Sequence, residues 1–133
     1  MQKMDTTILC VDDEENQLTL RRLMLEKAGY RVLIAESPAK AIELFRSDAV
    51  DLVIVDYYMP GMNGLSLARE LLREKKLPIV VLSAYAELPG ESIGMADMWI
   101  TKGTAAEELL TKLAELLSRG TSLTGRRSGN PET

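Results

Sequence analysis

The chain has 133 residues, enough for one domain with an ordinary core, and its 46% hydrophobic and 27% charged residues are typical of a globular protein. The net charge of −4 offers no electrostatic footprint for nucleic acid. The absence of histidine excludes His-based metal sites, His general bases and Ser-His triads. The lone Cys10 excludes an internal disulfide, and its apolar surroundings indicate core packing. We recognise no membrane span and no secretory leader, so we expect a cytoplasmic protein.

Five short apolar runs occupy residues 8–11, 31–35, 51–56, 77–82 and 98–101. Runs of this kind are typical of strands that are buried on both faces of a parallel sheet. A helical pattern follows each run, although it is weak after the fourth. The alternation predicts an α/β fold, in which a doubly wound, five-stranded parallel sheet has helices on both faces.

Apolar residues at helical spacing define one face of each predicted helix. In chain order they are Leu20, Leu23, Met24 and Ala28; Ala41, Ile42 and Phe45; Leu65, Ala68, Leu71 and Leu72; and Ala106, Leu109, Leu110, Leu113 and Leu117. Gly29 indicates the end of the first helix, and Ser37 followed by Pro38 indicates the start of the second. Thr104 and Glu107 form a predicted capping box for the last helix.

Two stretches depart from this pattern. Pro89, Gly90 and Gly94 interrupt the segment between the fourth and fifth strands, so the fourth helix should be short or irregular. From about residue 119 onward the composition is that of a linker, which predicts a disordered tail. We therefore expect one domain over residues 1–119 and a flexible linker or tail over residues 120–133.

Polar side chains stand where four of the five predicted strands end: Asp12 and Asp13, Asp56, Ser83, and Lys102. In a parallel sheet these ends are neighbours at one edge, where open α/β sheets bind ligands. Three crowded carboxylates repel one another, and a divalent cation resolves the conflict. Because Cys and His ligands are lacking, oxygen ligation favours Mg²⁺, with Mn²⁺ or Ca²⁺ as alternatives.

A lysine and a serine hydroxyl opposite this cluster are suited to hold an anion. Carboxylate nucleophile, divalent metal, lysine and hydroxyl are together the groups needed to accept a phosphoryl group. Singly, each has a simpler explanation: Asp56 could cap a turn, and Asp12 and Asp13 could favour a helix N-terminus. Ser83 could be only a strand-end hydroxyl, and Lys102 could be solvated. The joint arrangement favours the functional interpretation.

Four short motifs carry this arrangement. They are Val11-Asp12-Asp13-Glu14, Asp56-x-x-Met59-Pro60-x-Met62-x-Gly64, Ser83-Ala84 and Trp99-x-x-Lys102. In combination they resemble the receiver domain of two-component response regulators, the CheY-like fold, over about residues 5–118. The resemblance implies a flavodoxin-like sheet with strand order 2-1-3-4-5.

The resemblance also implies a phosphorylation cycle on Asp56, which would attack phosphorus and become an acyl phosphate. Asp56 and Asp13 would bind Mg²⁺ directly and Asp12 chiefly through water. The backbone carbonyl of Tyr58 would complete the protein ligands.

Three further residues have implied roles in phosphoryl binding and switching. Lys102 would pair with one phosphoryl oxygen, and Ser83 would move to bond another. Trp99 occupies the position of the aromatic residue whose inward rotation reports the phosphorylated state. The family usually has Tyr or Phe there, and packing of Trp99 against the fourth helix is the alternative interpretation.

Two other departures from the family concern the backbone. Gly103 replaces a proline that commonly follows a cis peptide bond, and a cis bond before a non-proline residue costs about 2.5–4 kcal/mol, so we expect a trans bond. The fourth helix belongs to the face on which family members dimerise. Its irregular sequence puts the usual homodimer in doubt.

Tyr58 and Tyr85 lie two residues after the acceptor and two after the hydroxyl residue, positions that border the path of the hydrolytic water in this family. One hypothesis is that they crowd this path and prolong the phosphorylated state. The alternative is that both rings are surface recognition groups.

We weighed four functions. The first is a non-enzymatic signalling module that receives its phosphoryl group from a histidine kinase or phosphotransfer domain and controls a downstream effector. The second is a Mg²⁺-dependent aspartyl-phosphate phosphohydrolase, which commonly has a second Asp where this chain has Tyr58. The third, a flavin or nucleotide site, lacks the Gly-rich phosphate loop. The fourth is a receiver-fold binding module that is not phosphorylated.

The position of the domain within the chain bears on its output. Because the receiver-like region starts close to Met1 and is followed by a polar tail, we favour an N-terminal receiver with its effector outside this chain over a stand-alone receiver. We expect this domain itself to contact neither nucleic acid nor membrane.

Overall fold

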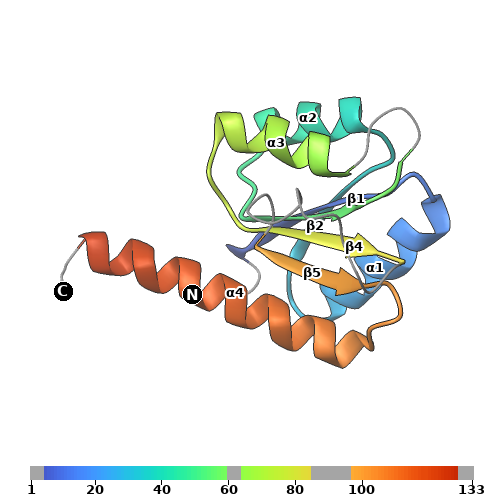
Figure 1. Ribbon diagram of the computed structural model, residues 1–133. Coiled ribbons are helices and arrows are strands. Elements are labelled where there is room, and N and C mark those ends of the chain that lie inside the picture. Colours follow the sequence, from blue (N-terminus) through green and yellow to red (C-terminus); the bar gives the residue numbers. More distant parts are fainter. Residues whose placement is uncertain (1–4, 60–63, 85–96, 129–133) are drawn as a thin grey trace.

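The computed structural model describes residues 5–59, 64–84 and 97–128. Five parallel strands form one sheet in the order β2-β1-β3-β4-β5 (Figure 1). The strands are β1 (Thr7–Val11), β2 (Arg31–Ala35), β3 (Leu52–Asp56), β4 (Ile79–Ser83) and β5 (Met98–Thr101). The predicted strand order is confirmed, and so are the strands, with small shifts at their ends.

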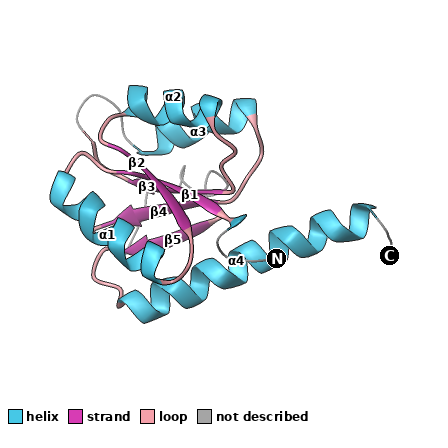
Figure 2. Cartoon of the chain, turned by 180° about the vertical axis from the view of Figure 1, so that it is seen from behind, coloured by secondary structure: helices cyan, strands magenta, loops and turns pink. Residues whose placement is uncertain are grey.

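Four helices cover the two faces of the sheet: α1 (Glu15–Lys27), α2 (Pro38–Ser47), α3 (Gly64–Glu74) and α4 (Ala106–Ser128). Helices α2 and α3 lie over one face, and α1 and α4 lie over the other (Figures 1 and 2). The helix predicted between β4 and β5 lies outside the described residues. The doubly wound architecture is therefore confirmed over the part of the chain that the structure describes.

The central strands explain why the apolar runs are continuous. In β1, Leu9 and Val11 belong to the hydrophobic core beneath α2 and α3, whereas Ile8 and Cys10 belong to the core beneath α1 and α4. Every residue of β1, β3 and β4 is buried. Since alternate side chains point to opposite covered faces, both sets must be apolar.

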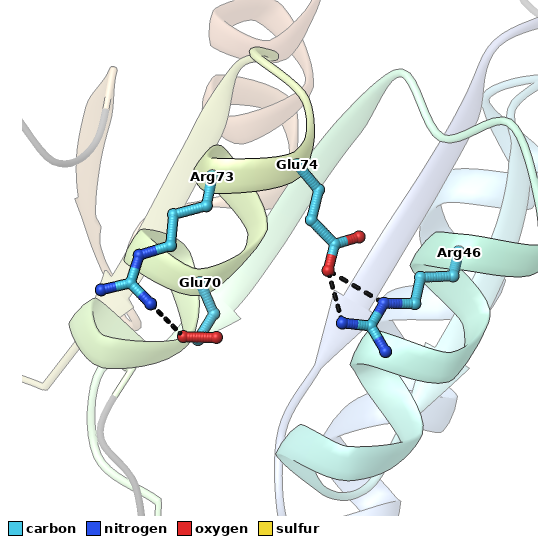
Figure 3. Close-up of polar contacts among 4 residues, drawn as sticks. All are labelled: Arg46, Glu70, Arg73 and Glu74. Carbon is cyan, nitrogen blue, oxygen red and sulfur yellow. Dashed lines mark hydrogen bonds and ion pairs between the residues drawn. The ribbon is translucent and has the colours of Figure 1, made fainter.

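The layer of α2 and α3 follows the sequence prediction closely. Ser37 caps α2 by accepting a hydrogen bond from the Lys40 amide at 3.2 Å, and Pro38 begins the helix. Outside the core, the Arg46 guanidinium of α2 donates to Glu74 of α3 at 2.6 Å from Nη2 (Figure 3). An exposed ion pair thus joins the two helices at the surface.

The buried face of α1 matches the predicted stripe only in part: Met24 and Ala28 pack partly buried against the core beneath α1 and α4. Leu20 and Leu23 are 63% and 59% exposed, and the buried residues are Leu18, Arg21 and Leu25. Two overlapping stripes exist at helical spacing, and the one that contains an arginine faces the sheet. An apolar pattern could not select it, because Arg21 is held inside by an ion pair.

Helix α4 begins later and ends later than predicted. The hydroxyl groups of Thr101 and Thr104 bond to each other at 3.1 Å, and the helix starts at Ala106, so the predicted capping box is wrong. Its buried residues are Leu109, Leu113 and Leu116, and Ala106 is exposed.

The C-terminal part of α4 runs on to Ser128 and projects past the sheet (Figures 1 and 2). The sequence predicts a flexible linker or tail over residues 120–133, and that tail stays a prediction, although the helix continues through residues 120–128. No proline occurs in that stretch, and a glycine costs about 1 kcal/mol in a helix without removing a hydrogen bond. The domain boundary at residue 119 stays a prediction. Among the described helices, none combines the length and apolarity needed to span a membrane.

Candidate phosphoacceptor and metal site

Strand register brings the predicted polar residues to one edge of the sheet. Val11 of β1 pairs with Val55 of β3, so Asp12 follows at the level of Asp56. Asp56 pairs with Leu82 of β4, and Ser83 pairs with Thr101 of β5, one residue before Lys102. Residues that lie far apart in the sequence thus converge at the carboxyl ends of β1, β3, β4 and β5, which are consecutive in the sheet.

Asp56 is the centre of this group. The residue is 4% exposed, and its Oδ1 lies 3.0 Å from the Lys102 Nζ. A cavity of about 410 Å³ opens beside it. The residues that line the cavity are Asp13, Glu14, Asp56, Tyr57, Tyr58, Ser83, Ala84 and Lys102. A nearly buried carboxylate therefore faces a space into which an anionic group could enter beside a lysine.

The surroundings of Asp56 disfavour its charged form. Burial raises the pKa of Asp56 above its ordinary value, the hydrogen bond from Lys102 lowers it, and the neighbouring charge of Asp12 raises it again. The net shift is upward. Lys102 alone does not compensate the negative charge that the fold concentrates here.

Asp12, Asp13 and Asp56 fit a divalent cation. Each can offer one carboxylate oxygen, and these oxygens lie within 4.8 Å of one another. Asp12 and Asp56 are buried, whereas Asp13 is exposed and lies on the cavity wall. Carboxylate oxygens are hard ligands suited to Mg²⁺, and a cation would also relieve the repulsion that raises the pKa of Asp56.

Aspartates at the opposite edge of the sheet have a different role. Asp51, just before β3, accepts a hydrogen bond from the Thr7 amide at 2.8 Å. Asp97, just before β5, accepts one from the Ile79 amide at 2.9 Å. Each of these carboxylates accepts a hydrogen bond from the first amide of a neighbouring strand. At the carboxyl edge, by contrast, three aspartates crowd together, which sets that edge apart from a general excess of aspartate.

Gly64 brings the start of α3 against the backbone of Asp56. Its amide donates to the Tyr57 carbonyl at 2.7 Å, and a Cβ added to Gly64 would lie 2.3 Å from the Asp56 carbonyl oxygen. Only a residue without a side chain fits there. Gly103, next to Lys102, has no atom within 4 Å of such a Cβ, and the described residues contain no cis peptide bond, as expected for this position.

Trp99 reaches the site through its neighbour Tyr57. The two ring centroids are 6.0 Å apart with planes tilted by 59°, and both side chains are half-buried against the core beneath α2 and α3. Tyr57 directly follows Asp56. The sequence did not single out Tyr57. The signal available in the sequence was that this aromatic residue directly follows Asp56.

The remaining predicted residues divide between the site and its margin. Ser83 is buried at the cavity, and its carbonyl accepts a hydrogen bond from the Lys102 amide at 2.8 Å. Tyr58 lines the cavity, but its side chain is 74% exposed, which fits a recognition group as well as a group that limits water access. Tyr85 lies outside the described residues.

Arg21 is a second residue near the site that sequence reasoning missed. Its Nη1 lies 3.4 Å from the Asp12 Oδ2, and the two side chains are 9% and 0% exposed. The signal in the sequence was an arginine in register with Leu18 and Leu25 on a helix that begins beside the acidic pair.

Comparison with known proteins identifies this arrangement. The sequence profile of the response regulator receiver domain matches residues 8–114. The chain belongs to the response regulator receiver domain family. Receiver domains are signalling domains, and this one is a phosphoacceptor domain of the two-component type.

Curated relatives and solved structures agree with the assignment. The phosphate regulon transcriptional regulatory protein PhoB of Pseudomonas aeruginosa is 37% identical over 120 residues, which are 85% of this chain and 52% of PhoB. The response regulator GtcR of Aneurinibacillus migulanus is 34% identical over 119 residues, covering 87% of this chain and 49% of GtcR. The receiver domain thus spans about half the length of these relatives.

Among solved structures, the response regulator protein TrrA of Thermotoga maritima, in complex with Mg²⁺ and BeF, is similar to this chain with a TM-score of 0.78 and 37% identity. The match covers 84% of this receiver domain and 98% of TrrA. A receiver domain from Clostridium thermocellum gives a TM-score of 0.81 at 26% identity, over 89% and 98% of the two chains.

Proposed function

We propose that Asp56 is the phosphoacceptor of this receiver domain, that Asp12, Asp13, Asp56 and the Tyr58 carbonyl bind Mg²⁺, and that Lys102 and Ser83 bind the phosphoryl group. The observation that carries the proposal is the position of Asp56, 4% exposed, 3.0 Å from the Lys102 Nζ and on the wall of a cavity. The structure of TrrA with Mg²⁺ and BeF supports the same chemistry by similarity.

The reaction follows from these positions. A carboxylate oxygen of Asp56 forms a bond to phosphorus while the bond from phosphorus to a donor nitrogen breaks, and the released nitrogen is later protonated by solvent. Asp12, Asp13, Asp56 and the Tyr58 carbonyl would hold Mg²⁺, which would neutralise the crowded carboxylates and polarise the phosphoryl oxygens. Lys102, released from its pair with Asp56 Oδ1, would hold one oxygen of the product. Ser83, at the end of β4, would bond another.

Trp99 is proposed to report this change. Since its ring packs on Tyr57, the residue after the acceptor, movement of the Asp56 segment on phosphorylation would alter the environment of the indole. Tyr58 and Tyr85 are proposed to limit access of water to the acyl phosphate. Tyr58 lines the cavity and is largely exposed to solvent.

The donor would be a histidine kinase or a phosphotransfer domain in the cytoplasm, and the output an effector domain or protein. The relatives PhoB and GtcR, of which this chain spans about half, support an effector encoded beyond the receiver. Mn²⁺ is proposed as a substitute for Mg²⁺, since it also accepts oxygen ligands. A homodimer remains one proposed form of the active state.

Intact mass after incubation with acetyl phosphate and Mg²⁺ tests the proposal. We expect addition of one phosphoryl group to the parent and none to Asp56→Asn or to the parent in EDTA, with a Trp99 fluorescence change in step with the mass. An adduct that persists in Asp56→Asn would contradict the assignment of the acceptor. No adduct under any condition would favour a receiver-fold binding module that is not phosphorylated.

A further inference from the structure

Arg21 is a buried cation for which the phosphoryl chemistry described above has no role. Its side chain is 9% exposed on α1, and its Nη1 lies 3.4 Å from the Oδ2 of the fully buried Asp12. Arginine is rarely buried without a partner, and here the partner belongs to the acidic cluster. Arg21 therefore supplies a positive charge where a cation would otherwise have to compensate Asp12.

The orientation of Asp12 does not depend on Arg21 alone. The other carboxylate oxygen, Oδ1, accepts a hydrogen bond from the Glu14 amide at 3.0 Å. This backbone contact also holds the carboxylate at the end of β1. Removing Arg21 would thus take away chiefly its charge.

A space beside Arg21 allows the guanidinium to move. A cavity of about 170 Å³ lies between α1 and the junction of β5 with α4, and Arg21, Gln17 and Thr104 are among the residues that line it. Thr101 and Lys102 also line this cavity and the rest of its lining is apolar, so it offers Arg21 room to turn and a few polar partners.

We propose that Arg21 is an internal counter-cation that competes with the divalent metal for Asp12, and so sets the affinity of the site. In the metal-free protein Arg21 stabilises the crowded carboxylates. A divalent cation repels the guanidinium and displaces it toward the cavity between α1 and α4. Arg21 is a positioning residue that acts through Asp12, and the inference rests on the metal site of the proposed function.

Charge arithmetic gives the direction of the effect. A univalent and a divalent cation within several ångströms repel each other strongly even at an effective dielectric constant of about 20. Part of the repulsion is relieved when the arginine moves. We expect that Arg21→Met, which keeps length and helix propensity but removes the charge, binds Mg²⁺ about tenfold more tightly than the parent.

The experiment measures Mg²⁺ affinity by calorimetric titration and thermal unfolding at a series of Mg²⁺ concentrations. Arg21→Met should unfold at a lower temperature than the parent in EDTA and recover in Mg²⁺, because the metal then compensates Asp12. A purely structural arginine would cause the same loss with and without metal. Arg21→Gln serves as a second neutral variant if Arg21→Met folds poorly.

Two controls separate local charge from general effects. Arg22→Met makes the same charge change one residue along α1, where Arg22 pairs with Glu26 at the surface. Arg21→Lys keeps the charge at the buried position. Both should keep the parent affinity within about twofold, and the gain in Arg21→Met should persist at high salt, since buried charges are weakly screened.

The outcomes distinguish the two levels of the argument. If the parent binds Mg²⁺ and Arg21→Met binds it equally or more weakly, Arg21 is not a competitor, although the metal site stands. If neither protein binds Mg²⁺, the metal site of the proposed function fails as well. If Arg21→Met binds Mg²⁺ more tightly while Arg22→Met and Arg21→Lys keep the parent affinity, the proposal is supported.

Discussion

The carboxyl edge of the sheet and the layer of α2 and α3 both contain arginine–carboxylate pairs, and they use them differently. Arg46 and Glu74 approach to 2.6 Å at the surface, with side chains 64% and 35% exposed (Figure 3). Arg21 and Asp12 are 3.4 Å apart, with side chains 9% and 0% exposed. In the exposed pair of Arg46 and Glu74, the contact replaces hydrogen bonds to water at little net gain. In the buried pair, Arg21 compensates the charge of Asp12, which has lost its contacts with water.

This difference teaches that burial, more than distance, decides what an ion pair does. The α2–α3 layer is held by apolar residues, and its ion pairs lie outside the core. At the carboxyl edge the fold places three carboxylates close together, and the start of α3 at Gly64 packs directly against the backbone of Asp56. The site should therefore respond strongly to small changes, while the helix layer should tolerate them.

The largest effect is expected from Gly64→Ala. The added methyl would stand 2.3 Å from the Asp56 carbonyl oxygen and 3.1 Å from the Tyr57 Cα, so either α3 or the acceptor segment must shift. We expect a loss of about 2–3 kcal/mol in the free energy of unfolding. Urea unfolding followed by circular dichroism measures it.

Gly103→Ala is the matched control for this substitution. A Cβ there has nothing within 4 Å, so the stability should change by no more than about 0.5 kcal/mol. Equal stabilities for the two alanine variants would mean that the close approach of α3 to Asp56 does not constrain the edge.

The second effect has the opposite sign. Burial, together with the charges of Asp12 and Asp13, raises the pKa of Asp56 despite Lys102, so the ionised carboxylate costs stability. Asp56→Asn should therefore stabilise the protein in EDTA at neutral pH by about 1 kcal/mol, a few degrees in Tm.

The pH dependence of that gain follows from the raised pKa. Below the ordinary aspartate pKa, Asp56 is protonated in both the folded and the unfolded protein, and the asparagine variant has little advantage. As the pH rises through the raised folded pKa, the parent loses that stability, and the gain should grow toward neutral pH. Thermal unfolding across this range measures the gain. A gain that shrinks as the pH rises would show that Lys102 outweighs burial.

Much of the fold and the site could be predicted from the sequence. Parallel strands covered on both faces must be continuously apolar, and their carboxyl ends must meet at one edge, so the runs around Val11, Val55 and Leu82 predict where Asp12, Asp56 and Ser83 gather. Ser37 and Pro38 likewise define a helix start by local chemistry alone.

The errors arose where tertiary contacts override local pattern. The apolar stripe of α1 misled because Arg21 points inward to a carboxylate on another element. The capping box at Thr104 failed because its hydroxyl bonds to Thr101 across the turn. A partner on another element decided the first case, and a hydroxyl three residues away decided the second.

The smallest effect is expected from Glu74→Gln, which breaks the surface pair. The hydrogen bond from Arg46 lowers the pKa of Glu74, so the pair adds stability above the ordinary pKa of a glutamate and loses it as the pH falls. Both side chains are open to solvent, so the Tm of Glu74→Gln should stay close to that of the parent, and the remaining difference should vanish in high salt.

Arg21→Gln provides the buried counterpart, because it also replaces one charged member of a pair by an amide. In EDTA its loss of Tm should exceed that of Glu74→Gln and should resist salt, since the Asp12 that remains is fully buried. If the two variants lose the same Tm and both recover in salt, the pair at 3.4 Å is as solvated as the pair at 2.6 Å. Burial would then not be what separates the edge of the sheet from its helix layer, and the competition between Arg21 and a metal would lose its physical basis.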